Sequence, residues 1–372
     1  MSENIDREYK KAAQIINSAG GTPFPLTDTL IEILKRLVEP EYLSFIRAFR
    51  KKKSQTMEQL KESSGLSEEE IEEKVKNLAK IGLIFNQPSS QGVMVYRLMP
   101  FVNVGIFEYT FMKELEDTPE NREIAQLFGK LKSEIKKRLT GNYDAVVSFL
   151  KKMPPIDRTI PVRENKATGK EIIIDQEIEV GEQQVLLTQT VEELIEKFND
   201  IAVGHCFCRH HKDLLDDPCK QTDLRENCFT FGKSARFTSE QGFARMISKE
   251  EALEILKKSE EDGLVHKAYH ANFDLKRDET SICNCCDCCC GQSGGPTVNY
   301  TNYISQVDQD ICVGCGTCVE HCHTKAMELN DDGKAKSRED LCIGCGVCAY
   351  FCPENAISLI ENPRKVVIAP AR

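Results

Sequence analysis

The placement of the cysteines constrains this chain more than any other feature. The sequence has 372 residues and eighteen cysteines, and none of these cysteines precedes Cys206. All seven histidines also lie in the same half, between His205 and His323. In a reducing compartment, so many cysteines indicate metal ligation rather than a disulfide framework. We therefore expect metal chemistry in the C-terminal half and a different role for the N-terminal half.

Composition indicates a cytoplasmic protein of two or three domains. The first residues, Met1 to Lys11, are polar and lack the apolar core of a signal peptide. No stretch approaches the ~18 apolar residues that would span a bilayer, so we expect no membrane insertion. The net charge of −10 argues against a general nucleic-acid binder.

The N-terminal part, residues 1–153, is predicted to be mostly helical, with helices at 28–38, 42–50 and 120–139. Within residues 54–98, a short helix ends near Gly65, and Ser67 with Glu70 forms a capping box that begins a second helix. Two apolar runs, 83–85 and 93–98, then predict a hairpin. This order of elements resembles a winged helix-turn-helix domain.

A duplicated motif, D-x-C-x-G-C-G-x-C, begins at Asp310 and again at Asp340. Each copy extends to the spacing C-x₂-C-x₂-C-x₃-C, and the cysteines are Cys312, Cys315, Cys318 and Cys322 in the first and Cys342, Cys345, Cys348 and Cys352 in the second. This spacing resembles the bacterial two-cluster ferredoxins over about residues 302–362. Zinc is the alternative for four cysteines, but two adjacent duplicated runs at this spacing favour iron–sulfur clusters.

The ferredoxin resemblance implies two [4Fe-4S] clusters with exchanged ligands. Cys312, Cys315, Cys318 and Cys352 would hold the first cluster. Cys342, Cys345, Cys348 and Cys322 would hold the second. One position departs from the family pattern, because His323 follows Cys322 where proline is usual.

Ten further cysteines lie upstream of this motif. They are Cys206, Cys208, Cys219 and Cys228, followed by Cys283, Cys285, Cys286, Cys288, Cys289 and Cys290. The C-x-C-R and C-N-C-C motifs in this region resemble an uncharacterised family of iron–sulfur proteins of anaerobes, over about residues 190–362. That resemblance implies no particular reaction.

The residues themselves leave the metal of this upstream region open. The first four thiolates could hold one further cluster, and the later six could hold another or complete the first. Zinc is the main alternative for the whole region. Arg209 could donate to a cluster sulfide or form an ordinary surface ion pair.

Three domains are predicted: a helical domain at 1–153 that contains the winged-helix-like segment 54–98, a cysteine-rich metal-binding α+β domain at 154–294, and a ferredoxin-type domain at 302–362. Residues 291–296 are expected to be a linker. In the middle domain we expect a hairpin of 159–163 with 171–175, a helix at 191–198, and a second helix capped by Ser248 and Glu251. The fold class is therefore α+β and multidomain.

These features favour an electron-transfer protein that relays single electrons through two [4Fe-4S] clusters to or from a redox protein partner. One alternative is a redox-sensing winged-helix transcription regulator. We do not expect DNA as a partner, however, because Glu68, Glu69 and Glu70 lie at the start of the candidate recognition helix and would face phosphate. The other alternative is a reductase with a catalytic cluster in residues 206–290. The sequence contains no recognisable nucleophile-and-base signature and no Gly-rich nucleotide loop, so it does not identify catalytic residues.

Overall fold

A computed structural model describes residues 2–20, 26–89, 91–102, 104–155, 157–174, 190–270, 278–290 and 297–369. The chain divides into two compact units. Unit 1 comprises Met1–Arg138, Gly204–Pro218 and Arg236–Arg245, and unit 2 comprises Leu139–Val203, Cys219–Ala235 and Met246–Arg372. The predicted linker 291–296 lies outside the described residues.

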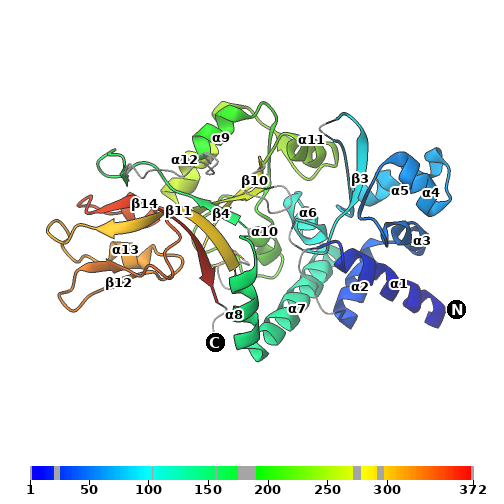
Figure 1. The fold of residues 1–372 in the computed structure, drawn as a ribbon, viewed down its shortest axis with the longest axis horizontal. Coiled ribbons are helices and arrows are strands. Elements are labelled where there is room, and N and C mark those ends of the chain that lie inside the picture. Colours follow the sequence, from blue (N-terminus) through cyan, green and yellow to red (C-terminus); the bar gives the residue numbers. More distant parts are fainter. Residues whose placement is uncertain are drawn as a thin grey trace. The chain divides into compact units, whose positions relative to one another are not determined.

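Unit 1 is built mainly from helices around one apolar core (Figure 1). Its elements are α1 Ser2–Asn17, α2 Asp28–Leu37, α3 Leu43–Ile46, β1 Ser54–Gln55, α4 Met57–Ser64, α5 Glu68–Ala79, β2 Ile84–Pro88, β3 Met94–Leu98, α6 Ile106–Met112, most of α7 Pro119–Gly141, α10 Phe207–Asp213 and part of α11 Lys233–Glu240. The core is rich in fully buried aromatic rings, including Phe45, Phe49, Phe111 and Phe128.

The segment predicted at 54–98 folds as a helix, a turn, a second helix and a hairpin. Gly65 ends α4 in the left-handed conformation, and the Ser67 side chain accepts a hydrogen bond from the Glu70 amide at the start of α5. The strands β2 and β3 pair in antiparallel fashion, and β1 adds a third strand. The predicted capping box and hairpin are therefore confirmed, while the winged-helix resemblance stays a prediction.

One predicted helix of unit 1 is wrong. Residues 42–50 do not form a single helix but the short α3 between two 3₁₀ turns, Pro40–Tyr42 and Arg47–Phe49. Leu43, Phe45, Ile46 and Phe49 are all buried there. The tighter 3₁₀ turns change which side chains share a face, so the packing of these apolar residues overrides the helical period.

Unit 2 contains most of a nine-stranded sheet in the order β5-β14-β11-β4-β9-β10-β7-β6-β8. The strands are β4 Asp157–Ile160, β5 Ile173–Ile174, β6 Ile201–His205, β7 Glu226–Phe231, β8 Arg245–Met246, β9 Val265–His270, β10 Glu279–Cys285, β11 Thr297–Val307 and β14 Ile357–Ile368. The helices are α8 Tyr143–Lys152, α9 Val191–Lys197, α12 Lys249–Glu261, α13 Thr317–Glu320 and α14 Val347–Tyr350, and a separate hairpin joins β12 Met327–Leu329 to β13 Ala335–Ser337.

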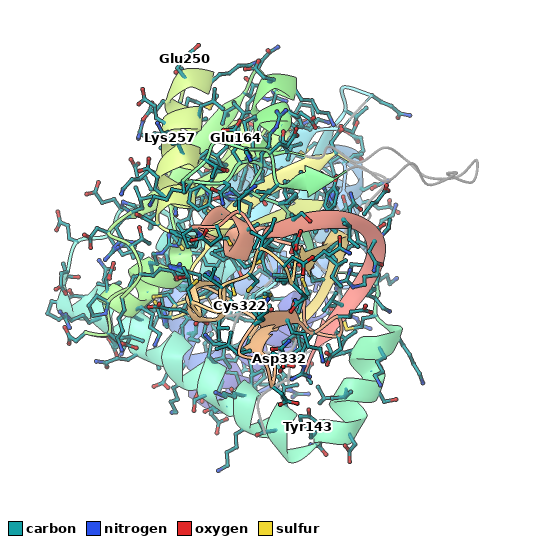
Figure 2. The ribbon with its side chains drawn as sticks, turned by 90° about the vertical axis from the view of Figure 1, so that its left-hand side faces the viewer. Tyr143, Glu164, Glu250, Lys257, Cys322 and Asp332 are labelled. Atoms are coloured by element: carbon teal, nitrogen blue, oxygen red, sulfur yellow. The ribbon has the colours of Figure 1, made fainter. Side chains whose placement is uncertain are left out.

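The sheet joins two segments that the sequence predicted as separate domains. β11 and β14 flank the ferredoxin motifs and pair with each other along their length, as Figure 1 shows. β11 also pairs with β4, which in turn pairs with β9 of the cysteine-rich segment. In Figure 2 the ferredoxin loops with Cys322 and Asp332 face the viewer, and α12 carries Glu250 and Lys257.

The predicted hairpin of 159–163 with 171–175 is wrong, although its turn exists. Gly169 has a positive φ of 63°, and Glu164 and Glu171 form a single bridge. The strands on the two sides then diverge, because β4 pairs with β9 and β11 whereas β5 pairs with β14. Long-range partners with buried faces outcompete the local pairing. Residue 175 lies outside the described residues.

Candidate metal centres

The two ferredoxin motifs enclose two cavities, each lined by four cysteines. The first cavity is lined by Cys312, Cys315, Cys318 and Cys352. The second is lined by Cys322, Cys342, Cys345 and Cys348. Each cavity therefore combines three cysteines of one motif with the last cysteine of the other, which is the exchange that the ferredoxin resemblance implies.

Glycines allow the cysteine loops to pass close to neighbouring backbone. Gly314 has a φ of +72°, and a Cβ placed there would lie 2.2 Å from the carbonyl oxygen of Gly333. Gly344 has a φ of +62°, and its Cβ would lie 2.2 Å from the carbonyl oxygen of Tyr303. Real Cβ atoms do not approach so closely, so both positions require glycine.

Backbone amides point at several of the lining thiols. The Ala326 amide donates to Cys322 Sγ at 3.1 Å, the Ala356 amide to Cys352 Sγ at 3.3 Å, and the Ala335 amide to Cys312 Sγ at 3.4 Å. Such donors stabilise negative charge on sulfur and are typical of metal–thiolate sites. The amides thus stabilise these sulfurs in the thiolate form, which is the form that binds metal.

Burial makes other thiols of the two cavities costly to ionise without a metal. It raises the pKa of Cys345 to about 12 and, with the charges of neighbouring cysteines, the pKa of Cys318 to about 11. The ligand form of cysteine is the thiolate. These side chains therefore need a positively charged partner inside the cavity, which an iron centre supplies.

A third group of thiols lies in the upstream region. Cys219, Cys286, Cys288 and Cys289 place their sulfurs within 4.8 Å of one another. The Cys288 sulfur lies 3.6 Å from that of Cys219 and 3.6 Å from that of Cys289. A hydrogen bond from Cys286 lowers the pKa of Cys219 to about 3, helped by the amides of Gln221 and Thr222 although burial opposes the shift.

Of the remaining cysteines of the 283–290 run, Cys283 contacts Cys228. The sulfurs of Cys228 and Cys283 are 3.7 Å apart, on the paired strands β7 and β10. Cys285 is buried, and hydrogen bonds with Cys283 and Cys290 raise its pKa. Cys219 and Cys228 thus contact different thiols of the later run, a division that the sequence did not predict.

Next to this second set lies a buried ion pair of Lys267 and Asp157. Lys267 Nζ is 3.0 Å from Asp157 Oδ2, and both side chains are almost completely buried. Burial alone would lower the pKa of Lys267, but Asp157, Cys285 and Cys290 raise it. Asn299 also donates to Asp157, so the pair connects β4, β9 and β11. No motif in the sequence marks these residues.

Cys206 and Cys208 belong to unit 1, where Cys206 is the N-cap residue of α10 and Cys208 is buried. Arg209 is fully buried, so an ordinary surface ion pair is excluded for it. His210 Nδ1 and His211 Nε2 each lie 3.0 Å from a backbone carbonyl oxygen, of Phe111 and Ala125 respectively. These contacts fix the orientation of the two imidazoles.

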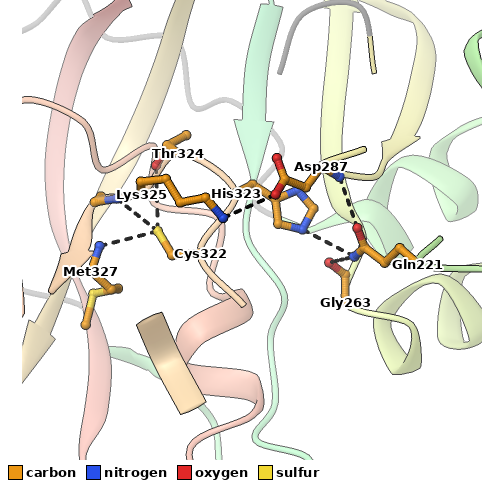
Figure 3. Close-up of polar contacts among 9 residues, drawn as sticks. Gln221, Gly263, Asp287, Cys322, His323, Thr324, Lys325 and Met327 are labelled. Carbon is orange, nitrogen blue, oxygen red and sulfur yellow. Dashed lines mark hydrogen bonds and ion pairs between the residues drawn. The ribbon is translucent and has the colours of Figure 1, made fainter. Parts of the chain in front are cut away.

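Polar contacts connect the loops that carry the third thiol group to the ferredoxin segment, and Figure 3 shows those made by Gln221 and Asp287. Gln221 accepts from the Asp287 amide at 3.0 Å, and its own amide group lies 3.3 Å from His323 Nε2. Lys325 forms an ion pair with Asp287 at 3.2 Å. The histidine at position 323, where ferredoxins usually have proline, was the one sequence signal of this contact.

Comparison with known proteins identifies the C-terminal motifs. Residues 305–359 match the family described as a 4Fe-4S dicluster domain. This stretch of the chain therefore binds [4Fe-4S] clusters, and the donor set of the two cavities fits them. The match covers a minor part of the chain and does not assign the remainder to a family.

The curated relatives found are small ferredoxins that match short stretches. A probable ferredoxin of Methanosarcina thermophila is 50% identical over 32 residues, which are 9% of this chain and 55% of that protein. A ferredoxin of Thermococcus litoralis is 52% identical over 31 residues, 8% of this chain and 51% of that protein. A ferredoxin of Pyrobaculum islandicum is 50% identical over 30 residues, 8% of this chain and 28% of that protein.

The chain thus spans about half the length, or less, of the curated relatives that it matches. No solved structure matches it. Among the described helices, none has both the length and the apolar character needed to cross a membrane.

Proposed function

We propose that this protein transfers single electrons between two [4Fe-4S] clusters and a redox protein partner, as a component of an oxidoreductase system. The observation that carries this proposal is the pair of four-cysteine cavities within the segment that matches a 4Fe-4S dicluster domain. When bound, such clusters exchange one electron at a time. The chain's own contribution is to hold, shield and orient them.

We further propose the ligand sets that the cavities suggest. Cys312, Cys315, Cys318 and Cys352 would hold one cluster, and Cys322, Cys342, Cys345 and Cys348 would hold the other. The upstream cysteines, Cys206 and Cys208 among them, are the candidate ligands of any additional centre.

The cysteines of the two cavities differ in solvent exposure, and this difference supports a proposal for where the partner docks. Cys315 is exposed, and Ile311 and Val313 beside it expose 47% and 65% of their surface. The cysteines of the second cavity are buried or half-buried. Exposed apolar side chains beside a redox site are typical of interaction surfaces. The partner would therefore dock at the loop of the first cavity.

The experiment that tests this function is redox titration of the anaerobically purified full chain, followed by iron and acid-labile sulfide analysis. We expect about eight irons and about eight sulfides in the ferredoxin segment, with two one-electron transitions at low potential. Zinc in place of iron at both motifs would contradict the proposal. A Val313→Asp variant should keep its iron but exchange electrons more slowly with the partner.

A further inference from the structure

The thiol group of Cys219, Cys286, Cys288 and Cys289 has a geometry unlike that of the two ferredoxin cavities. Its four sulfurs all lie within 4.8 Å of one another. Among the described residues, which include all eight cysteines of the ferredoxin motifs, no other set of three or more potential ligands lies so close together. The eight ferredoxin cysteines instead surround open cavities.

The spacing of the sulfurs distinguishes one metal ion from a cluster. Four thiolates around one tetrahedral ion, each with a metal–sulfur bond of about 2.3 Å, lie about 3.8 Å apart. The separations of 3.6 Å from the Cys288 sulfur to the sulfurs of Cys219 and Cys289 agree with that value. In a [4Fe-4S] cluster each thiolate binds a different iron corner and points outward, so the four sulfurs must lie farther apart.

The surroundings of the group also suit a thiolate site. The Lys220 amide donates to Cys288 Sγ at 3.4 Å, and the amides of Gln221 and Thr222 donate to Cys219. Fully buried Leu264 packs against Cys286 and Cys289 and excludes water from their side. These are the amide donors and apolar cover that tune metal–thiolate centres.

We propose that Cys219, Cys286, Cys288 and Cys289 bind a single thiophilic metal ion, zinc or iron, without inorganic sulfide. The ligands come from two segments, the loop after Pro218 and the turn after β10, and the ion joins them. Both zinc and iron accept four thiolates in tetrahedral geometry, so the ligand set defines the nuclearity of the site and the experiment identifies the metal.

The ion would also fix the position of the loop that contacts the ferredoxin segment. Asp287 lies between two of the ligands, and its side chain pairs with Lys325 while its amide donates to Gln221. Gln221 lies two residues after Cys219 and contacts His323, the neighbour of Cys322 (Figure 3). Metal binding at this site would therefore fix the position of the loops that contact His323 and Lys325 beside the second cavity.

The test measures metal and sulfide in the anaerobically purified full chain. A [4Fe-4S] cluster contains equal iron and sulfide, so the sum of iron and zinc should exceed sulfide by one atom per chain. In a Cys286→Ser/Cys288→Ser variant this excess should fall to zero while sulfide is unchanged. The matched control is Cys283→Ser, in the same run but outside the group, and it should keep the excess.

Two outcomes would overturn the proposal. Loss of four irons together with four sulfides in the double variant would show a cluster at this site. No excess of metal over sulfide in the wild-type chain would show that no single ion is bound. Because the double variant could fail to fold, the exposed Cys288 is also replaced alone, and the visible absorption of the ferredoxin clusters reports on folding. The site also predicts tetrahedral thiolate bands in wild-type protein exchanged with Co²⁺.

Discussion

At the scale of single residues, the sharpest expectation concerns the fourth cysteine of each ferredoxin motif. Cys322 follows Cys318 closely in the sequence, yet it lines the other cavity, with Cys342, Cys345 and Cys348. The Cys322→Ser variant should therefore lose the cluster of that cavity, about half of the iron, and keep the one at Cys312 and Cys315. Electron paramagnetic resonance of the reduced protein distinguishes the two clusters.

The reciprocal variant Cys352→Ser serves as the control, since Cys352 lines the first cavity. It should remove the signal that the Cys322→Ser variant retains. If each serine instead removed the cluster nearest in sequence, the exchange of ligands would be wrong.

Two glycines of one loop allow the effect of backbone strain to be measured separately from the effect of a steric contact. Gly314 and Gly316 both have positive φ, but a Cβ would meet the Gly333 carbonyl at 2.2 Å only at Gly314, and nothing within 4 Å at Gly316. Gly316→Ala should therefore lower the free energy of unfolding by only the ~1–2 kcal/mol that a left-handed alanine costs, and the variant should keep its full iron content. Gly314→Ala should displace the β12–β13 turn and lose iron from the first cavity.

Iron content and the midpoint of thermal unfolding measure this pair of variants. Equal iron loss in both would mean that strain alone, and not the contact with Gly333, governs the loop.

At the scale of elements, the buried ion pair holds three strands of the sheet together. Asp157 on β4 pairs with Lys267 on β9 and accepts from Asn299 on β11. Asp157→Asn would leave the Lys267 ammonium buried without its partner carboxylate, and removal of one member of a buried pair costs about 3–5 kcal/mol. We expect a clearly lower unfolding midpoint for unit 2, followed by circular dichroism.

The double variant Asp157→Asn/Lys267→Met provides the comparison. Replacing both charges removes the unpaired ammonium, so this variant should regain much of the lost stability. If the double variant were less stable than Asp157→Asn, the cost would come from packing and not from the charge.

At the scale of the whole molecule, the negative net charge limits which partners the chain can bind. The chain carries a net charge of −10, and the first turn of α5 presents Glu68, Glu69 and Glu70. Phosphate contacts supply most of the affinity of DNA-binding proteins, and acidic side chains oppose them. We expect no site-specific duplex DNA complex at physiological salt. A complex tighter than ~10⁻⁸ M in a gel-shift or anisotropy titration would favour the regulator alternative.

The sequence by itself determined those features that depend on local spacing. The duplicated cysteine motif, through its resemblance to the two-cluster ferredoxins, predicted two four-cysteine sites that each take one cysteine from the other motif, and the two cavities have this lining. The capping residues Ser67 and Ser248 located the beginnings of α5 and α12, because an N-cap hydrogen bond spans only three residues.

Only the tertiary structure decided which distant segments meet. It divided the upstream cysteines, bringing Cys219 to Cys286, Cys288 and Cys289 and placing Cys228 beside Cys283. It also joined β11 and β4 into one sheet across a predicted domain boundary. The local sequence of a strand does not specify which strand pairs with it, since any half-buried strand offers the same amide and carbonyl groups. The partner is chosen by the total apolar surface that the assembled sheet buries.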